Sequence, residues 1–325
     1  MQAVTAVRLD NDDPLSGLRV GPVPEPDIPY GWTMVHVRAA SLNRHDLWSL
    51  RGVGLTERQL PMVLGCDAAG VDEDGRRVLV HSVISDPDWL GDETLDPGRS
   101  LLSERFAGTF AERLAVPRRN LIPLPDHLSF TEAACLPTAW LTAYRMLFTQ
   151  AQVRPGHTIL VQGAGGGVSS ALIRLASDAG VRVWVTSRSG ERRERAVAEL
   201  GADEAFEPGA RLPERVDAVM ESVGAATWGH SLRALRPGGT VVCCGATTGW
   251  DPSAELNRVF FLQLRVLGST MGSRDELVAL TRFVTDRDVR PYVDRELPLA
   301  QAAEAFAAME RGDVFGKLVL TNTPD

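Results

Sequence analysis

The feature that most constrains the fold is a glycine-rich segment between an apolar run and an amphipathic stretch. Residues 158–162 are typical of a buried strand, and from Val168 onward apolar residues recur at helical spacing. Glycines let a backbone approach an anion closely, and a new helix points unpaired N–H groups and its positive dipole end at that anion. The pattern therefore predicts a pyrophosphate-binding turn, formed by Ala164, Gly165, Gly166, Gly167 and Val168.

A second apolar strand, residues 181–186, is followed by Ser187 and Arg188. In a dinucleotide site this strand end meets the adenosine ribose, where a carboxylate would accept a hydrogen bond from the free 2′-hydroxyl of NAD. A hydroxyl and a guanidinium suit a 2′-phosphate instead, so we predict NADP as the cofactor. One departure from the usual fingerprint is Ser169, which stands where its last glycine is expected.

Length and composition limit the classes of protein. The chain has 325 residues, which suits two domains, with 44% hydrophobic and 23% charged residues. No apolar run approaches a membrane span, the N-terminus lacks a signal-peptide core, and the net charge of −8 comes without a basic block. We expect a cytoplasmic protein that binds neither membrane nor nucleic acid, with its four cysteines reduced.

The pattern of elements changes along the chain. Residues 1–126 carry short alternating segments typical of β-structure, interrupted by an acidic loop over residues 82–105. From about residue 129, helices and strands alternate, as in a doubly wound parallel sheet. The predicted helices cover 132–147, 168–179, 191–200, 275–284 and 300–311, and the predicted strands cover 158–162, 181–186, 216–220, 240–244, the region near Tyr292 and 317–320.

Five motifs in order give the chain a family resemblance. They are Gly65-Cys-Asp-Ala-Ala-Gly70, Gly108-Thr-Phe-Ala-Glu112, Thr142-Ala-Tyr144, the glycine turn, and Gly316-Lys-Leu-Val-Leu320. With them the chain resembles the medium-chain dehydrogenase/reductases. The resemblance implies an α/β fold, with a β-rich GroES-like catalytic domain (1–126 and 272–325) around a Rossmann domain (127–271). It also implies a homodimer, paired through the apolar segment 259–267.

The resemblance extends the cofactor site beyond the glycine turn. Thr142 resembles the family threonine beside the nicotinamide, and Lys317 either reaches the cofactor phosphates or is a solvated lysine at a strand end. Doubly wound sheets bind ligands at the carboxyl ends of their strands. The residues expected there are Ser222, Val223, Gly224, Gly245, Ala246, Ser269, Thr270 and Met271.

The zinc ligands of the family's alcohol dehydrogenases are missing. Asn43 and Thr138 stand at two cysteine positions and Cys66 at the histidine position, and no cysteine lies between Cys66 and Cys135 for a structural zinc lobe. We therefore predict no metal. The alternative is an improvised site made of Cys66, His45 and either Asp46 or Asp67.

Zinc-free relatives are similar to quinone oxidoreductases and to NADPH-dependent reductases of activated double bonds. We expect a quinone or an enone or enal as substrate, Asn43 to orient the acceptor carbonyl and Thr138 to line the same pocket. His45 is either a proton relay or an exposed loop residue. Asp46 and Asp67 either take part in catalysis or, as we favour, bond backbone or arginine groups. Two other functions stay open: a divergent zinc-type alcohol dehydrogenase, and a protein that binds NADPH without turnover.

Overall fold

The computed structural model describes residues 1–322, which divide into two compact units. One unit holds residues 1–139 together with the C-terminal segment from Met271, and the other is Trp140–Thr270. The predicted boundary was residue 126, whereas the first unit extends to Ala139. Residues 323–325, the end of the predicted catalytic domain, lie outside the described residues.

The first unit is built around a seven-stranded, mostly antiparallel sheet. Its strands follow the order β10 (Leu121–Pro123), β6 (Arg77–Val80), β5 (Ala68–Asp72), β3 (Trp32–Ser41), β18 (Lys317–Thr321) and β17 (Val293–Pro298), and β9 (Arg113–Pro117) also pairs with β3. A three-stranded sheet holds β2 (Leu18–Pro22), β1 (Gln2–Ala6) and β4 (Met62–Val63), and β7 (Val83–Ile84) pairs with β8 (Ser100–Leu101). The helices are α1 (Arg44–Leu50), α2 (Phe130–Ala134), α8 (Arg274–Asp286) and α9 (Ala302–Arg311). Because β18 pairs antiparallel with β3, the two distant parts of the chain share one sheet.

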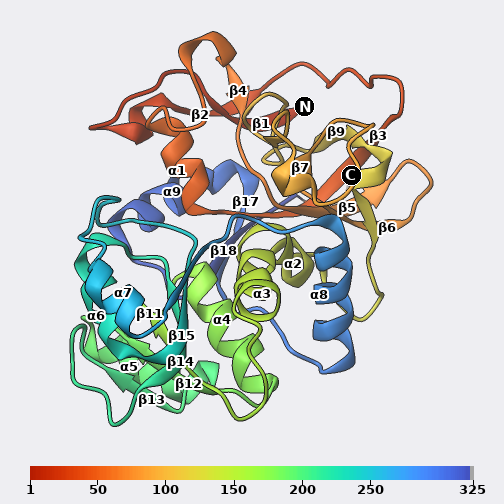
Figure 1. Cartoon of the computed structure of the whole chain (residues 1–325). Coiled ribbons are helices and arrows are strands. Elements are labelled where there is room, and N and C mark those ends of the chain that lie inside the picture. Colours follow the sequence, from red (N-terminus) through yellow and green to blue (C-terminus); the bar gives the residue numbers. More distant parts are fainter. Residues whose placement is uncertain (323–325) are drawn as a thin grey trace. The chain divides into compact units, whose positions relative to one another are not determined.

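The second unit is a six-stranded parallel sheet with helices on both faces (Figure 1). The strand order is β13 (Glu204–Phe206), β12 (Arg182–Thr186), β11 (Thr158–Gln162), β14 (Val216–Glu221), β15 (Leu235–Cys243) and β16 (Arg265–Gly268). The helices are α3 (Leu141–Tyr144), α4 (Gly167–Asp178), α5 (Gly190–Arg195, continued by a turn to Leu200), α6 (Ala225–Ala234) and α7 (Leu256–Phe261). The strand order reverses between β11 and β14, which is where such sheets bind ligands. The predicted α/β fold class is confirmed.

Two predicted elements differ from the structure. The helix expected over 132–147 is interrupted by a wide π-helical turn at Leu136–Trp140, where Pro137 has no N–H to continue the regular pattern. The apolar segment 259–267, which the resemblance assigns to dimer pairing, is not a single element, because it contains the end of α7 and most of the edge strand β16.

None of the helices within residues 1–322 combines the length and apolar character that a bilayer span requires.

Candidate active site

The glycine turn has the geometry of an anion-binding loop. Gly163 and Gly165 have φ values of +91° and +96°, which side chains with a Cβ rarely adopt, and Gly166 is the N-cap of α4. The first helical hydrogen bond runs from the N–H of Ser170 to the carbonyl of Gly166, at 2.8 Å. The N–H groups of residues 167–169 therefore precede the helical ladder and need partners from outside it.

Ser169, the departure from the fingerprint, stabilises this turn. Its Oγ accepts from the N–H of Gly166 at 2.8 Å and donates to the carbonyl of the same residue at 3.1 Å. The hydroxyl thus holds the N-cap in place of the close packing that a glycine would allow.

The end of β12 presents one unpaired cation. Thr186 is turned inward, since its Oγ1 donates to Gln162 Oε1 at 2.6 Å and accepts from the N–H of Gly163 at 3.3 Å. Ser187 is buried, whereas Arg188 is exposed and has no hydrogen bond or ion pair within residues 1–322. Arg188 is therefore the group at this strand end that can meet a phosphate without giving up a protein partner.

A buried carboxylate fixes the loop after β14. Glu221, which the sequence analysis missed, is fully buried, and its Oε1 accepts from the N–H groups of Val223 at 2.8 Å and Gly224 at 3.0 Å. Its other oxygen accepts from Ser231 Oγ at 2.6 Å. The predicted strand ended at residue 220, and a carboxylate directly after a strand carries no signal of burial, so only the hydroxyls that α6 contributes reveal its role.

The neighbouring strand-end loops pack against this one. A Cβ on Gly224 would lie 2.8 Å from the Cα of Ala246, and one on Gly245 would lie 3.4 Å from the carbonyl oxygen of Ser222. After β16, the backbone of Ser269 donates to the carbonyl of Cys243 at 2.9 Å, and its Oγ is buried with no partner in the described chain. Residues 222–224, 245–246 and 269 thus meet at one edge of the sheet, as expected for a ligand site.

Three other predicted cofactor residues lie next to a unit boundary. Thr142 is buried in α3. Thr270 is the last residue of the second unit, and Met271, with a φ of +50°, is the first of the C-terminal segment of the other unit. Their contact with a cofactor stays a prediction. The glycine turn, the uncommitted N–H groups and Arg188 nevertheless fit a dinucleotide.

In the first unit, Lys317 is the centre of a buried polar network. Its Nζ donates to Asn43 Oδ1 and to the carbonyl of Leu42, each at 2.7 Å, and lies 3.5 Å from Asp67 Oδ2. The lysine side chain is 2% exposed and that of Asp67 is 0% exposed. The burial of Lys317 contradicts the solvated alternative, and contact of its ammonium with cofactor phosphates stays a prediction.

Asn43 has both ends of its amide committed to this network. Its Nδ2 donates to Asp67 Oδ2 at 2.8 Å while its Oδ1 accepts from Lys317, and Ser41 Oγ also donates to Asp67, at 2.7 Å. An oxygen that accepts from an ammonium is not available to a zinc ion, so Asn43, which stands at a cysteine position of the family's zinc site, does not fit that metal. The expectation that Asp67 bonds arginine or backbone groups is also wrong, because its partners are side chains of Ser41, Asn43 and Lys317.

Thr138 leaves a polar group without a partner. Its Oγ1 is buried and has no hydrogen-bond partner among residues 1–322. Cys135, one turn earlier, lies close enough to Lys317 and Asp67 for their charges to act on its thiol, and burial raises the pKa of that thiol to about 12. The Thr138 hydroxyl is therefore an available hydrogen-bond donor in the same unit as the Lys317 network.

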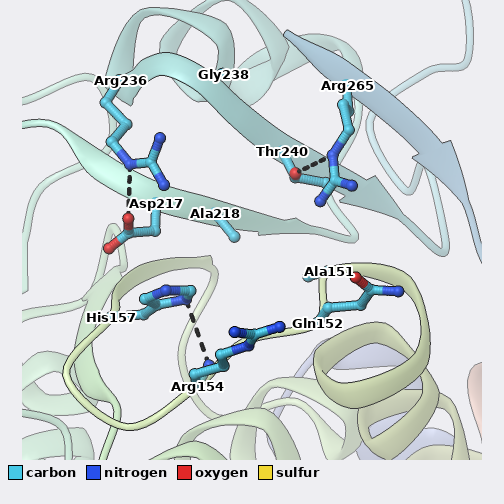
Figure 2. A pocket seen from close by; sticks show the side chains of 10 residues that line it. All are labelled: Ala151, Gln152, Arg154, His157, Asp217, Ala218, Arg236, Gly238, Thr240 and Arg265. Atoms are coloured by element: carbon cyan, nitrogen blue, oxygen red, sulfur yellow. Dashed lines mark hydrogen bonds and ion pairs between the residues drawn. The ribbon is translucent and has the colours of Figure 1, made fainter.

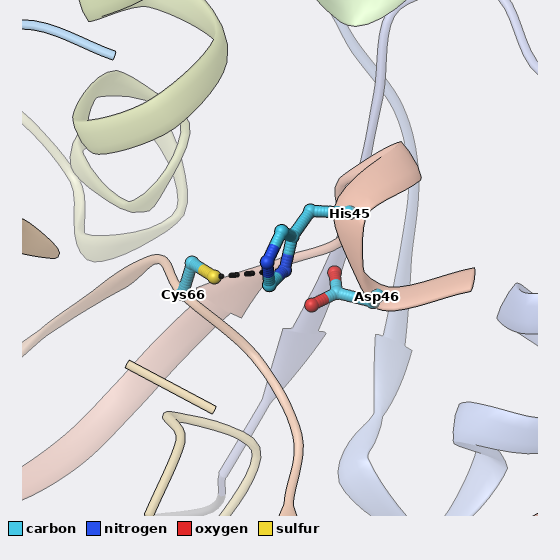
Figure 3. Close-up of side chains that lie close together, drawn as sticks. All are labelled: His45, Asp46 and Cys66. Atoms are coloured by element: carbon cyan, nitrogen blue, oxygen red, sulfur yellow. Dashed lines mark hydrogen bonds between the residues drawn. The ribbon is translucent and has the colours of Figure 1, made fainter. Parts of the chain in front are cut away.

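Beside the network, Cys66, His45 and Glu104 form a hydrogen-bonded chain. Cys66 Sγ lies 3.3 Å from His45 Nδ1, as drawn in Figure 3, and His45 Nε2 lies 3.1 Å from Glu104 Oε1. Cys66 is fully buried, and its Sγ also donates to the carbonyl of Leu102 at 3.3 Å. The His45 side chain is 21% exposed, so it connects the buried thiol to the unit's surface.

The environment shifts the pKa values in this cluster. Burial raises the pKa of the Cys66 thiol, which keeps a proton on the sulfur. Burial disfavours the charged imidazole, but Cys66, Glu104 and Asp46 outweigh it and hold the pKa of His45 well above its usual value. Burial also raises the pKa of Asp46 to about 6; its Oδ2 accepts from the N–H of Asn43 at 2.7 Å, and its Oδ1 has no partner in residues 1–322.

One nitrogen of His45, one oxygen of Asp46 and the sulfur of Cys66 lie within 4.8 Å of one another. These are three of the donor types that zinc uses. The sulfur, however, donates a hydrogen bond to a carbonyl as a thiol does, and a metal would require it as a thiolate. Within the cluster, Cys66 and His45 share a hydrogen bond, whereas Asp46 bonds the backbone of Asn43.

Comparison with known proteins assigns the family. Residues 29–126 match the alcohol dehydrogenase GroES-like domain, and residues 195–320 match the zinc-binding dehydrogenase model. A zinc-type alcohol dehydrogenase-like protein of Schizosaccharomyces pombe is 30% identical, over 89% of this chain and 90% of the relative. The chain belongs to the medium-chain dehydrogenase/reductase family. It is therefore an NAD(P)-dependent oxidoreductase.

Other relatives of this medium-chain dehydrogenase/reductase differ in activity. Crotonyl-CoA carboxylase/reductase of Cereibacter sphaeroides is 27% identical, over 96% of this chain and 85% of the relative. A crystal structure of an NAD-dependent alcohol dehydrogenase superposes with a TM-score of 0.91 at 34% identity, covering 99% of this chain and 100% of that one. The structure of a 2-octenoyl-CoA carboxylase reductase in complex with NADP and 2-octenoyl-CoA superposes with a TM-score of 0.89 at 28% identity. It covers 98% of this chain and 87% of that one.

Proposed function

We propose that this protein transfers hydride from NADPH to a conjugated acceptor, a quinone or an α,β-unsaturated carbonyl compound, without the family's zinc. The observation that carries the proposal is the hydrogen bond from the Lys317 ammonium to Asn43 Oδ1, at the position of a zinc ligand. The relatives whose names describe reduction of an enoyl-CoA support the same class of reaction.

The chemistry of the acceptor follows from what the first unit offers. Reduction of a simple ketone develops charge on one oxygen and normally uses a Lewis acid. A conjugated acceptor spreads that charge over several atoms, so hydrogen bonds and one proton suffice. When bound, the nicotinamide supplies the hydride, and for an enone the hydride adds to the β-carbon while a proton adds to the α-carbon.

His45 is the proposed proton relay. It carries an ionisable ring at the unit's surface, and both of its nitrogens have partners that fix the ring: Cys66 at Nδ1 and Glu104 at Nε2. Thr138, with its unpartnered hydroxyl, is the proposed hydrogen-bond donor to the acceptor oxygen. Asn43 acts through the Lys317 network and is a positioning residue, since no strong donor of its amide is left for a substrate.

Arg188 is the proposed reason for a preference for NADP. Its guanidinium is exposed, unpaired in the described chain and located where the ribose of a dinucleotide meets the second strand. A charge-assisted hydrogen bond from arginine to phosphate is stronger than a hydrogen bond between neutral groups. Replacement of Arg188 is therefore expected to weaken the binding of NADPH, which carries the 2′-phosphate, and to leave the binding of NADH unchanged.

The test is NADPH oxidation by metal-stripped protein, under anaerobic conditions, with a quinone, a 2-enal and a simple aldehyde in parallel. We expect turnover of the quinone or the enal alone. The variant His45→Gln is expected to lower kcat by about a hundredfold, within the usual range for loss of a general acid. The matched control, His127→Gln, changes an exposed histidine elsewhere in the unit and leaves kcat unchanged.

The second arm of the test concerns the cofactor. Arg188→Ala is expected to raise the KM for NADPH by about tenfold and leave that for NADH unchanged, whereas Arg211→Ala, at another exposed arginine, changes neither. Equal loss for the two cofactors would contradict the role of Arg188.

A divergent zinc-type alcohol dehydrogenase is the second candidate, favoured by the closely spaced donor atoms of His45, Asp46 and Cys66. It requires one equivalent of zinc in the purified protein and aldehyde turnover that added zinc restores. Tight NADPH binding without oxidation by any acceptor would instead identify a protein that binds the nucleotide without catalysis.

A further inference from the structure

The second unit contains a cavity at the edge of its sheet where the strands begin. Its volume is about 200 Å³, and its wall includes residues at or next to the start of β11, β14 and β16, and in the middle of β15. The glycine turn and the loops after β14 and β15 follow the opposite ends of these strands. The cavity is therefore separate from the dinucleotide site.

Three arginines and one carboxylate give this cavity its charge. The side chains of Arg154, Arg236 and Arg265 extend toward the same space, as Figure 2 shows. Asp217 is the one acidic residue of the wall. The local excess of positive charge contrasts with a chain whose net charge is −8.

Asp217 is already fully used by its neighbours. Its Oδ1 accepts from Arg236 Nε at 2.6 Å, and its Oδ2 accepts from the N–H of Thr158 at 2.8 Å. Although burial opposes ionisation, these two hydrogen bonds lower the pKa of Asp217, so it is charged at neutral pH. One carboxylate therefore neutralises one of the three guanidinium groups.

The other two guanidinium groups have no acidic partner within residues 1–322. Arg265 donates from Nε to Thr240 Oγ1 at 2.9 Å, which leaves its two terminal nitrogens unpaired in the described chain. The side chain of Arg154 makes no hydrogen bond or ion pair there, although its backbone N–H donates to His157 Nδ1 at 3.3 Å. Because that nitrogen accepts, the proton of a neutral His157 ring is on Nε2, which adds a further donor.

We propose that this cavity binds a phosphate dianion, either inorganic phosphate or the terminal phosphate of a small metabolite. A carboxylate has two oxygens and is saturated by one guanidinium fork, whereas a phosphate has three or four oxygens for donors that converge from several directions. Here donors converge from the segment before β11, from β15 and from β16. The cavity is smaller than the roughly 300–1,000 Å³ of drug-sized sites, which excludes a whole dinucleotide.

The ligand would join elements that are far apart in the sequence. Arg154 precedes the first strand of the sheet, and Arg265 begins its last strand, β16, at the edge. One anion bonded to both would hold the edge strand to the centre of the sheet. The inference is independent of the proposed hydride transfer, since no residue of that mechanism lines the cavity.

The experiment is calorimetric titration of inorganic phosphate into protein that is saturated with NADP⁺, in a phosphate-free buffer of constant ionic strength. Saturation fills the dinucleotide site, so phosphate cannot report on Arg188 and the glycine turn. Parallel titrations with glycerol phosphate and with acetate separate a free phosphate from a phosphate monoester and from a carboxylate. If NADP⁺ does not bind, the same titration on Arg188→Ala protein replaces saturation, so failure of the proposed function leaves this test intact.

We expect saturable binding of phosphate or glycerol phosphate at one site and none of acetate. Arg154→Gln and Arg265→Gln are each expected to weaken it by about tenfold, and Arg211→Gln, an exposed arginine away from the cavity, leaves it unchanged. All three positions are exposed, so the variants fold, which unchanged circular dichroism verifies. Absence of binding, equal binding of acetate, or unchanged affinity in both cavity variants would overturn the proposal.

Discussion

The buried ammonium of Lys317 makes a strong prediction about stability. Lys317→Met puts in an unbranched apolar side chain that is one atom shorter, and removes the charge. It leaves the carboxylate of Asp67, which is 0% exposed, with the hydroxyl of Ser41 and the amide of Asn43 as its remaining donors. It also leaves two oxygens, the carbonyl of Leu42 and Asn43 Oδ1, without the donor that each has at 2.7 Å.

The expected loss follows from breaking a buried charge pair. Removal of one partner from such a pair costs about 3 to 5 kcal/mol, because an uncompensated charge stays inside the protein. The double variant Asp67→Asn with Lys317→Met removes both charges, so it is expected to be more stable than the single variant by about 1 to 3 kcal/mol. Lys317→Arg keeps the charge and is expected to lie between the wild type and Lys317→Met.

Urea unfolding, followed by circular dichroism and tryptophan fluorescence, measures these differences. Because the chain has two compact units, unfolding can show two transitions, and the relevant one is the transition whose midpoint the Lys317 variants change. The shift of that midpoint, multiplied by the denaturant slope of the wild type, gives the change in unfolding free energy. A loss below about 1 kcal/mol for Lys317→Met, or a double variant as unstable as the sum of its single variants, would refute the reasoning. Lys317 is also the only lysine, so slow modification of its amine in the native protein gives a second measure of burial.

Three further predictions concern other parts of the chain. Glu221→Gln places an amide group among hydrogen-bond donors. We expect the unfolding free energy in urea to fall by about 1 to 3 kcal/mol, and NADPH binding, measured by fluorescence titration, to weaken. Unchanged values in both measurements would refute the role of Glu221. Burial opposes ionisation of Glu93, but His81, whose Nε2 lies 2.9 Å from Glu93 Oε1, and the N–H of Arg274 outweigh it and lower the pKa of Glu93. The carboxylate therefore stabilises the fold at pH values above 4.5, the pKa of Glu93 in the unfolded chain. The difference in unfolding free energy between the wild type and Glu93→Gln is expected to disappear as the pH falls below that pKa. A difference that stays constant from pH 7 to 3 would contradict this. Val266 is 47% exposed on the edge strand β16, where a second copy of the chain is expected to pair. Light scattering should therefore find a dimer for the wild type and a monomer for Val266→Arg. A monomeric wild type would refute the predicted pairing.

The sequence was most informative about the second unit. Its strands at 158–162, 181–186 and 216–220 lie within a residue of their predicted bounds, because alternation of buried strands and amphipathic helices is a local signal. The glycine turn was equally visible, since a left-handed backbone conformation at Gly163 and Gly165 demands a residue type that the sequence displays directly.

Local signals failed where a side chain has a choice of partners. The position of Lys317 in the sequence leaves open whether its amine is solvated, bound to a cofactor or buried. Likewise, nothing in the sequence around residue 104 indicates that Glu104 holds the ring of His45. An acidic residue in a loop that is predicted as acidic carries no signal of its own.

The sequence by itself determined the two kinds of architecture, the dinucleotide turn and the absence of the usual zinc ligands. Only the tertiary structure decided the chemistry of the first unit, because the pairing of β18 with β3 brings Lys317 to Asn43 across 274 residues. The same holds for the basic cavity, whose arginines come from β15, from β16 and from the segment before β11. Spacing along a chain specifies local conformation, whereas charges that lie far apart in the sequence acquire partners only when the sheets assemble.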